Sequence, residues 1–323
     1  MSENLNTTIN ETQPSSCSSN PTAEKIGKTF AYCLFFIVSL AGNAVLGIIF
    51  YKTKTMRKPI NFFIVNMAMS DLLFPVFVIP SHMLMLYTDS WLIGGSLGQA
   101  FCKLKTFLPD VSTAVFIQSL VLIAVDRFGA VVFPLRSPLI SSKLCPFFIL
   151  ATWIVVIAVN STELFVLKLV EYPGELVCKR HWNEVFGESS SPENYFMSYI
   201  VVFIFIPLAL IAILYIIICL KLKSQKIPGE QSANAGQTRQ QRERKVLKMA
   251  IAIVLGFAVR WLPRAILFIL LVTNSIVLPN CGISYFFYTL RLLSVANSAI
   301  NPSICFIFSR NYRKELQAFL IYR

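Results

Sequence analysis

Seven long apolar stretches alternate with short polar segments along the chain. About 20 apolar residues in a helix cross the roughly 30 Å hydrocarbon core of a bilayer, because a helix rises about 1.5 Å per residue. Each stretch is long enough, so the pattern predicts an all-α membrane protein with seven transmembrane helices. We expect these helices near residues 29–51, 60–87, 99–132, 143–167, 195–221, 246–273 and 284–308.

The polar segments complete the organisation of the chain. Residues 1–28 are rich in Asn, Ser and Thr and have no apolar core near the start, which indicates an N-terminal tail rather than a cleavable signal peptide. Residues 227–241 contain Gly, Gln and Ser without an apolar period, which predicts a flexible loop. Residues 309–323 follow the transmembrane domain, 29–308, and their mixture of apolar and basic side chains predicts a short amphipathic helix on the membrane surface.

The composition supports a membrane protein. The chain of 323 residues is 55% hydrophobic and 14% charged, whereas a soluble domain has about 25% charged residues. The net charge of +13 would favour nucleic-acid binding in a soluble protein. Here the basic residues flank the apolar stretches, where they report topology. The expected partner is therefore the lipid bilayer, and no nucleic acid is expected.

Charge differs between alternate loops and predicts the orientation. Lys and Arg gather between the first and second stretches, between the fifth and sixth, and after the seventh. The loop between the fourth and fifth stretches has more Glu than Lys and Arg. Basic loops stay in the cytoplasm, so we expect a multi-pass plasma-membrane protein with an external N-terminus and a cytoplasmic C-terminus. Asn6 and Asn10 lie in glycosylation sequons, which an external tail would expose.

Two of the eight cysteines are placed for a disulfide. Cys102 begins the third stretch and Cys178 lies in the loop between the fourth and fifth. Both are expected on the oxidising side, where disulfides form, so a bridge would hold this loop over the mouth of the bundle. Cys17 and Cys281 are candidates for a second external bridge. The others are expected to remain thiols: Cys33, Cys145, Cys219 and Cys305.

Asp71, in the middle of the second stretch, is the clearest candidate for a functional residue, since a charge inside a bilayer is unfavourable. One interpretation is a structural acid satisfied by amides such as Asn43, Asn297 and Asn301. The other is a polar, water-lined core that holds a cation or a proton. With only two histidines and no Cys-x-x-Cys pair, a zinc site is not expected, and no cofactor is predicted.

A second group of charges lies at the cytoplasmic edge. Asp126 and Arg127 end the third stretch, and Glu243 precedes the sixth. An Arg127–Glu243 contact would hold the bundle closed at this face; the alternative is that these are solvated flanking charges. Pro263 and Pro302 lie inside later stretches. Proline removes a helix hydrogen bond and permits a kink, so both are candidate hinges.

With these residues considered together, the chain resembles the rhodopsin-like (class A) G-protein-coupled receptors over about residues 29–320. The resemblance rests on dispersed motifs in the right order rather than on one signature. They are Gly42-Asn43, Asp71-Leu72, Trp91 with Gly94, Cys102 with Cys178, Asp126-Arg127-Phe128, Trp153, Pro207 with Tyr215, Phe257, Trp261-Leu262-Pro263 and Asn301-Pro302.

The resemblance implies roles for individual residues. It implies that Arg127 contacts Glu243 at rest and the G protein when active, and that the sixth helix swings outward. It places Trp261 at the floor of a ligand pocket, above a set of residues that repack on activation. The residues implied in coupling and activation are Asp126, Arg127, Tyr215, Glu243, Ile117, Pro207, Phe257, Asn301 and Pro302.

Four positions depart from the family's pattern. Phe128 replaces the tyrosine that usually follows the arginine. Cys305 stands in place of the tyrosine of the family's Asn-Pro-x-x-Tyr motif. Phe116 stands where a serine usually helps to bind sodium beside Asp71, so a sodium ion at Asp71 is an open question. Arg260 stands where a cysteine usually precedes the tryptophan.

The sequence narrows the ligand by exclusion. Amine receptors use an aspartate where this chain has Pro109, and the neighbouring Asp110 is turned by about 100° around the helix. Opsins need a lysine where this chain has Val295. The candidate pocket has charges of both signs, which suits a peptide, and Arg264 or Arg291 would hold a carboxylate by paired hydrogen bonds. The candidate ligand-binding residues are His82, Lys105, Asp110, Glu163, Trp261, Arg264 and Arg291.

The loop that contains Cys178 also indicates a peptide ligand. Residues 170–179 fit a β-hairpin with a turn at Tyr172-Pro173-Gly174. A hairpin lid with a disulfide, and the segment that ends in Trp261-Leu262-Pro263, resemble receptors of the neuropeptide Y, galanin, tachykinin and RFamide type. We therefore predict a receptor that binds an extracellular neuropeptide and activates heterotrimeric G proteins.

Other functions remain as alternatives. The first is a class A receptor for a small acidic or lipid ligand. A secondary transporter would usually show repeated halves and paired broken helices, which the sequence lacks. An intramembrane enzyme would need a nucleophile–base set or metal ligands within the apolar stretches, and no such motif occurs. The chain is therefore not expected to be an enzyme.

Overall fold

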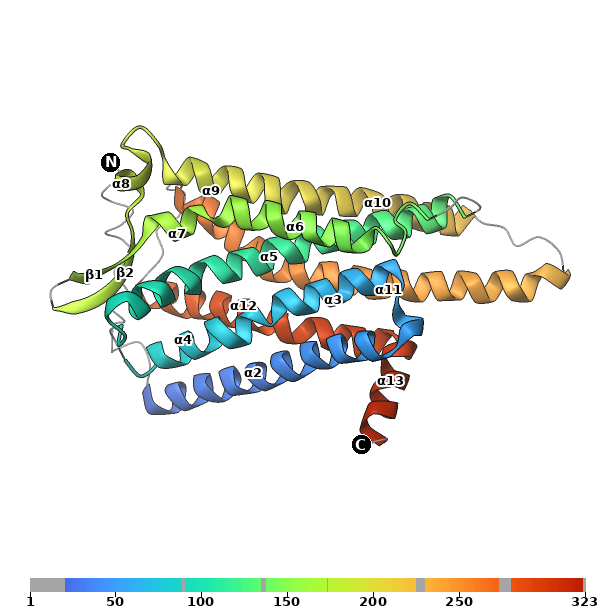
Figure 1. The fold of residues 1–323 in the computed structure, drawn as a ribbon, viewed down its shortest axis with the longest axis horizontal. Helices are drawn as coiled ribbons and strands as arrows, with labels where there is room; N and C mark the ends of the chain where they lie inside the picture. The colour runs from blue at the N-terminus through green and yellow to red at the C-terminus, as the bar shows by residue number, and fades with distance from the viewer. Residues whose placement is uncertain are drawn as a thin grey trace.

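The bundle of seven transmembrane helices is confirmed. The computed structural model describes residues 21–88, 91–134, 138–172, 174–224, 230–272 and 280–321. Within them, seven helices are long and apolar enough to cross a membrane, and they run along the long axis of the molecule (Figure 1). The first four spans are α2 (Pro21–Lys52), α3–η2–α4 (Pro59–Asp71, Phe74–Val78 and Ile79–Met85), α5 (Gly95–Val132) and α6–α7 (Cys145–Asn160 and Thr162–Val166).

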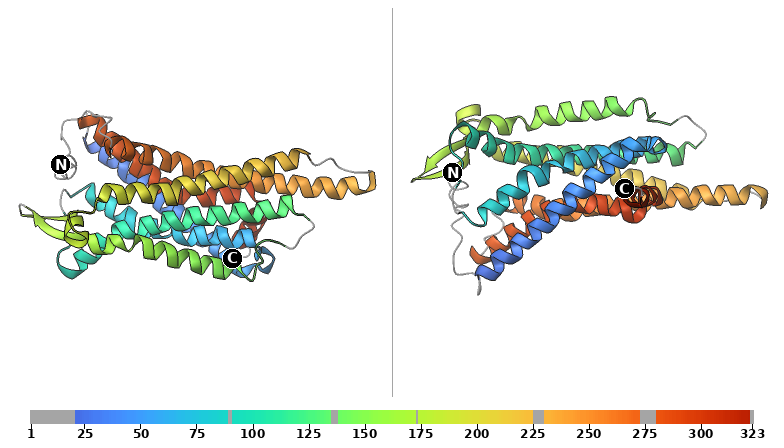
Figure 2. Two further views of the ribbon diagram at one scale, coloured as in Figure 1. Left: turned by 90° about the horizontal axis from the view of Figure 1, so that it is seen from above. Right: turned by 60° about the horizontal axis from the view of Figure 1, so that its bottom comes forward.

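The remaining elements complete the bundle and its two ends. The last three spans are α9–η3–α10 (Pro192–Ile200, Val201–Phe205 and Ile206–Ser224), α11 (Glu230–Val272) and α12 (Asn280–Phe308). The shorter elements are η1 (Lys54–Met56), β1 (Leu167–Tyr172), β2 (Glu175–Arg180), α8 (Trp182–Phe186) and α13 (Arg310–Ile321). The two strands lie at one end of the bundle, and α11 projects from the other (Figure 2).

Two expectations about polar segments are wrong. The first helix begins at Pro21 rather than near residue 29. Proline suits the first turn of a helix, and Glu24 pairs with Lys28 one turn later. The predicted loop 227–241 is helical from Glu230 onward as the first part of α11. Its Gln, Glu, Arg and Ala residues are good helix formers, and extending an existing helix is easier than starting one.

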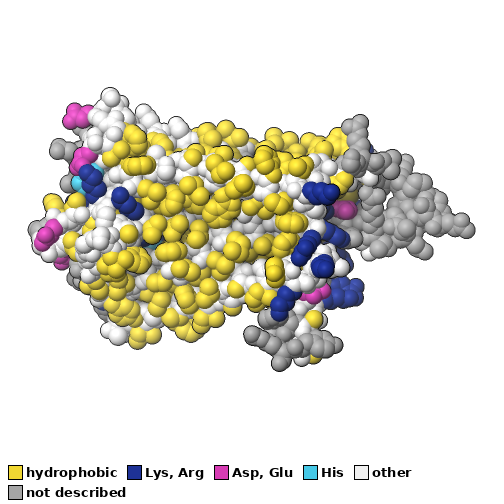
Figure 3. Space-filling view, viewed as in Figure 1, with side chains coloured by type: hydrophobic (Ala, Val, Ile, Leu, Met, Phe, Trp, Pro, Cys, Tyr) yellow, Lys and Arg dark blue, Asp and Glu magenta, His cyan; other side chains and the backbone are white. Residues whose placement is uncertain are grey.

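The spans differ in how deeply they are buried. In α5, 56% of the most apolar segment is buried, against 22% in α6–α7, so α5 lies at the centre and α6 at the edge. The outer surface is a broad apolar belt, with charged side chains gathered toward the two ends (Figure 3). A soluble protein rarely exposes a continuous apolar surface of this extent, which supports burial of the belt in lipid.

Polar side chains join the inner helices across the apolar core. Asn66 on α3 donates to the hydroxyl of Ser119 on α5 at 2.9 Å. The indole of Trp153 on α6 donates to the amide oxygen of Asn66 at 2.9 Å. Hydrogen bonds between transmembrane helices contribute about 0.6 kcal/mol each on average. This chain of bonds fixes the register of α3, α5 and α6, so it positions the central helix that carries most of the site.

The predicted hairpin is confirmed. β1 and β2 pair antiparallel, with Leu169 opposite Cys178. Gly174 in the connecting turn has a φ of +84°, a backbone conformation that glycine adopts without steric cost. The loop between α7 and α8 therefore forms a short two-stranded sheet at the end of the bundle opposite α13 (Figure 1).

The predicted amphipathic helix after the last span is also confirmed, as α13. It turns away from the bundle axis (Figure 1). Tyr312 is its buried anchor, and its hydroxyl donates to Asn61 Oδ1 at 3.4 Å. Burial raises the pKa of Tyr312 well above its usual range, so the hydroxyl keeps its proton. Thr53 donates to Glu315 at 3.0 Å and adds a second link to the rest of the bundle.

Candidate functional site

The hairpin is attached to the third span at two points. A disulfide joins Cys102 to Cys178, with the two Cα atoms 5.7 Å apart, as predicted. Three residues earlier on α5, the Gln99 side chain donates to the carbonyl of Leu167 at 3.0 Å and accepts from the amide of Leu169 at 2.6 Å. The disulfide and these hydrogen bonds hold β1 and β2 over the end of the bundle. Cys17, from the other proposed bridge, lies outside the described residues.

Beneath the hairpin, the candidate pocket has an acidic side. Glu163 at the start of α7 is buried and accepts two hydrogen bonds from Arg180 of β2, at 3.2 and 3.1 Å. Such a paired contact is the strong form of an arginine–carboxylate interaction. Asp110 on α5 interacts electrostatically with both residues. Arg180 was not among the predicted site residues; its position two residues after Cys178 was the available signal.

Basic side chains lie near this acidic group, and one of them, Arg264, interacts electrostatically with Asp110. His82 on α4 interacts electrostatically with Lys105 on α5, Arg264 on α11 and Arg291 on α12. The Lys105 ammonium lies 5.1 Å from the ring centre of Trp91. The structure thus brings four predicted ligand-binding residues from four helices into one group, which we call the basic cluster: His82, Lys105, Arg264 and Arg291.

Aromatic rings form the floor. The Arg264 guanidinium lies 5.5 Å from the ring centre of Trp261. Trp261 stacks on Phe257 with ring centres 6.2 Å apart, and Phe257 stacks on Phe116 at 5.4 Å. Phe116, Phe257 and Ile117 are fully buried. A ligand group that displaces Trp261 would therefore also displace Phe257 and Phe116 at the centre of the bundle. A close-packed core has no free space to absorb the movement of the tryptophan ring.

Arg260, whose charge departs from the family's pattern, lies next to this floor. Its guanidinium donates to the hydroxyl of Thr113 on α5 at 3.1 Å. It also lies over the rings of Phe74 and Trp261, 5.1 and 5.6 Å from their centres. Arg260 and Asp71 are both buried and have opposite charges, and Arg260 Nε and Asp71 Oδ1 each have no hydrogen-bond partner among the described residues.

Asp71 is bound by one of the amides that we expected. Asn301 on α12 donates to Asp71 Oδ2 at 2.7 Å. Asn43 instead donates to the carbonyls of Ser39 and Ser298, at 2.9 and 2.8 Å. The Asn297 side chain makes no hydrogen bond in the described part of the structure. Asn301 therefore joins the second span to the last, next to the kink position Pro302.

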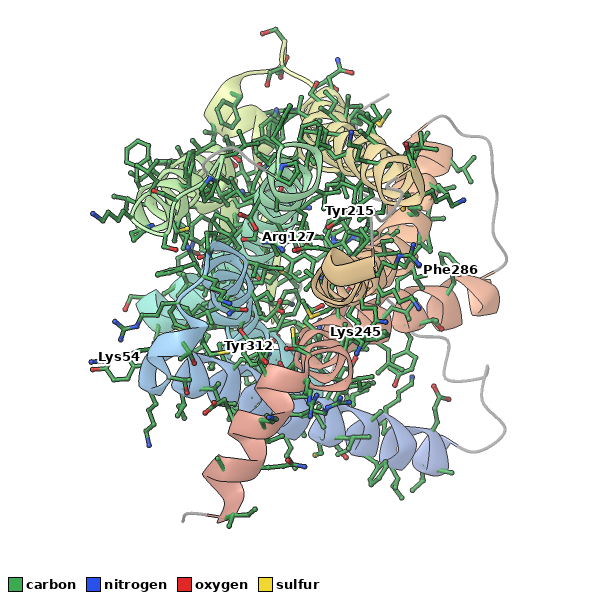
Figure 4. The ribbon with its side chains drawn as sticks, turned by 90° about the vertical axis from the view of Figure 1, so that its right-hand side faces the viewer. Lys54, Arg127, Tyr215, Lys245, Phe286 and Tyr312 are labelled. Atoms are coloured by element: carbon green, nitrogen blue, oxygen red, sulfur yellow. A yellow bond between two sulfur atoms is a disulfide. The ribbon has the colours of Figure 1, made fainter. Side chains whose placement is uncertain are left out.

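At the other end of the bundle, Arg127 contacts two acids. Its guanidinium donates to Asp126 Oδ2 at 2.5 and 3.0 Å and to Glu243 Oε2 on α11 at 3.4 Å. The structure therefore contains the α5–α11 contact that the sequence indicated. Viewed from this end, Arg127 and Tyr215 lie within the ring of helices, whereas Lys54 lies at its edge (Figure 4). The Tyr215 hydroxyl is buried without a hydrogen-bond partner among the described residues.

Seven membrane-spanning helices, a hairpin joined to the third span by a disulfide, and the Arg127–Glu243 contact are typical of a seven-helix membrane receptor. Comparison with known sequences identifies the same class. Residues 42–304 match the family described as 7 transmembrane receptor (rhodopsin family). The chain belongs to this family, which consists of receptors, and the expectation of a receptor rather than an enzyme is confirmed.

Similar proteins come from several animals. The chain is 30% identical over 308 residues to a QRFP-like peptide receptor of Branchiostoma floridae, covering 93% of this chain and 79% of that receptor. It is 29% identical over 283 residues to a substance-K receptor of Homo sapiens, covering 88% and 70%. It is 28% identical over 316 residues to a neuropeptide Y receptor type 6 of Oryctolagus cuniculus, covering 93% and 82%.

Proposed function

We propose that the chain is a cell-surface receptor for a peptide and that it activates heterotrimeric G proteins. The observation that supports this most is the charged pocket under a pinned hairpin, which contains the basic cluster and the Arg180–Glu163 pair. A peptide presents several polar groups at once and suits a pocket with charges of both signs. The relative from Branchiostoma floridae carries the name peptide receptor.

The basic cluster favours an acidic group on the peptide. Glu163 is already paired with Arg180. Arg264 and Arg291 have exposed side chains, and Arg264 also interacts electrostatically with Asp110. Arginine binds carboxylates through paired hydrogen bonds. A free C-terminal carboxylate or an acidic side chain would bind at this cluster, with Trp261 beneath it.

α11 provides the connection between the pocket and the G protein. It carries Arg264 at the pocket and Glu243 at the Arg127 contact, 21 residues apart, which is about 30 Å of helix. Pro263 lies inside this helix and permits bending there. A ligand that displaces Trp261 would move α11, separate Glu243 from Arg127 and open the cytoplasmic end for the G protein.

The proposal includes the orientation in the plasma membrane. The hairpin end and the N-terminal tail are extracellular, and α13 and the projecting end of α11 are cytoplasmic. The disulfide at the hairpin end needs an oxidising compartment, and basic residues follow the last span at the other end. Asn6 and Asn10, which lie outside the described residues, would carry glycans.

A library of amidated and free-acid peptides tests the ligand class. Cells that express the receptor are challenged with the library, and G-protein activation is measured. A dose-dependent response should be lost or shifted at least tenfold in Arg264→Ala and Arg291→Ala, since a charged hydrogen bond contributes about 1.5–3 kcal/mol. The control is Lys168→Ala, because Lys168 on β1 pairs with the exposed Glu184 of α8 and is not one of the proposed ligand-binding residues. A response to small acids or lipids alone, at normal surface expression, would contradict the peptide proposal.

A further inference from the structure

Two opposite charges are buried in the membrane part of the bundle and belong to no ligand contact proposed above. Asp71 is 1% exposed and Arg260 is 6% exposed. An ionised group in a medium of low dielectric is unfavourable unless it is paired and hydrogen-bonded. Each of these two groups therefore needs the other, or a substitute for it.

Arg260 is held in position by a hydrogen bond and by two aromatic rings. Its Nη2 donates to Thr113, and its guanidinium lies over the faces of Phe74 and Trp261, an arrangement that stabilises a cation. Phe74 follows Asp71 by three residues, so its ring brings the guanidinium toward Asp71, and Asp71 Oδ1 and Arg260 Nε are both buried without a hydrogen-bond partner among the described residues. Arginine keeps its charge in proteins, so this positive charge is permanent. It is also attached to α11, next to the tryptophan at the pocket floor.

The buried positive charge of Arg260 disfavours a bound sodium ion at Asp71. Sodium needs several oxygen ligands, but the residue at the position where the family usually has a serine is Phe116, which is fully buried and apolar. One carboxylate oxygen of Asp71 already accepts the hydrogen bond from Asn301, whereas the other oxygen and the Asn297 amide oxygen are buried without a partner among the described residues. With Arg260 present, a sodium ion would leave a net positive charge in a low-dielectric core, which is unfavourable.

We propose that Arg260 is a built-in counter-cation for Asp71, which takes the place of a mobile sodium ion in this receptor. The stability of the bundle therefore does not depend on sodium. It depends instead on the pairing of α3, which ends at Asp71, with α11, which carries Arg260. A cation that is part of α11 cannot leave its site, so the pair restrains the helix whose movement opens the cytoplasmic end.

Thermal unfolding of the purified full-length receptor tests this without a ligand. The unfolding temperature is measured in sodium chloride and in N-methylglucamine chloride at an ionic strength of about 0.15 M. The wild type should unfold at the same temperature in both. Arg260→Met removes the charge and keeps the length of the side chain, and it should lower the unfolding temperature by roughly 5–10 °C, because it leaves Asp71 buried and unpaired.

A double-mutant cycle tests the pairing itself. Asp71→Asn in the Arg260→Met background should restore part of the lost stability, whereas Asp71→Asn alone should lower it, because a non-additive result reports direct coupling. If Arg260→Met does not fold, the double variant should fold again. Arg264→Met is the matched control, since this arginine lies on the pocket side of the floor, and its effect should add to that of Asp71→Asn.

Two results would overturn the proposal. One is a saturable rise in the unfolding temperature of the wild type with sodium, because a mobile cation would then bind. The other is strict additivity of Asp71→Asn and Arg260→Met, or failure of the double variant to recover folding. In either case, Arg260 would not be the counter-charge of Asp71.

Discussion

Arg127 is shared between its neighbour on the same helix and an acid on another. The contact with Asp126 is the shorter one, and the contact with Glu243 is 3.4 Å long. The bond to Asp126 orients the guanidinium, and the bond to Glu243 links α5 to α11. The weaker of the two contacts is thus the one that has to break when α11 moves.

Removal of the charge at Glu243 should raise signalling in the absence of ligand. Glu243→Gln weakens the contact with Arg127, and a partly exposed ion pair contributes up to about 1 kcal/mol, which corresponds to a roughly twofold to fivefold rise in basal activity. The measurement is basal nucleotide exchange at matched surface expression. Glu315→Gln is the control, because Glu315 bonds to Thr53 at the same end of the bundle and not to Arg127. Unchanged basal activity in Glu243→Gln would contradict a resting lock.

At the scale of single residues, the sequence shows which charged residues lie inside the apolar stretches, but it does not show which residues they contact. Asp71 and Arg127 are recognisable because charges are rare in apolar stretches. The hydrogen bond between Arg260 and Thr113 and the pairing of Arg180 with Glu163 join residues far apart in the chain. The sequence around each residue does not identify its partner, so both pairs depend on how the helices and the hairpin pack.

At the scale of elements, the first and last spans approach each other closely at Gly42. A Cβ atom at this position would lie 2.7 Å from Cγ of Pro302 on α12, which is far inside van der Waals contact. Glycine therefore allows α2 to pack against the proline of α12. Gly47 lies five residues later on α2, and a Cβ atom there would meet nothing within 4 Å.

The pair of glycines provides a matched test of this contact. Gly42→Ala should destabilise the receptor by about 1–3 kcal/mol, the usual effect of overpacking, and lower its unfolding temperature by several degrees. Gly47→Ala should leave stability unchanged or raise it slightly, because alanine favours a helix over glycine. Thermal unfolding of the two purified variants is the measurement. Equal effects of both substitutions would show that the approach of α2 to Pro302 is not close.

The elements that the sequence predicted best are those with a strong local pattern. The apolar stretches, the hairpin turn at Gly174 and the amphipathic α13 each have one. The segment from Glu230 to Gln241 was predicted as a loop because no apolar period was present, but it is helical. A polar segment can continue a helix that the neighbouring span has already nucleated, and periodicity does not detect this.

At the scale of the whole molecule, one helix contributes to every part of the proposed mechanism. α11 carries Arg264 and Trp261 at the candidate pocket, Arg260 over the Trp261 ring and Glu243 at the contact with Arg127. Its resting position is therefore determined at several depths in the membrane. A ligand has to change the balance of these contacts, since it shifts an equilibrium only by its differential affinity for the two states.

The most direct test of this account is nucleotide exchange by purified components. The receptor is placed in a lipid bilayer disc with a purified heterotrimeric G protein, and an activating peptide from the library is added. We expect dose-dependent exchange by the wild type and none by Arg127→Ala, while Arg127→Ala still binds the peptide. Peptide binding without exchange in the wild type, or equal exchange in Arg127→Ala, would contradict a mechanism in which the pocket signals through α11 to Arg127.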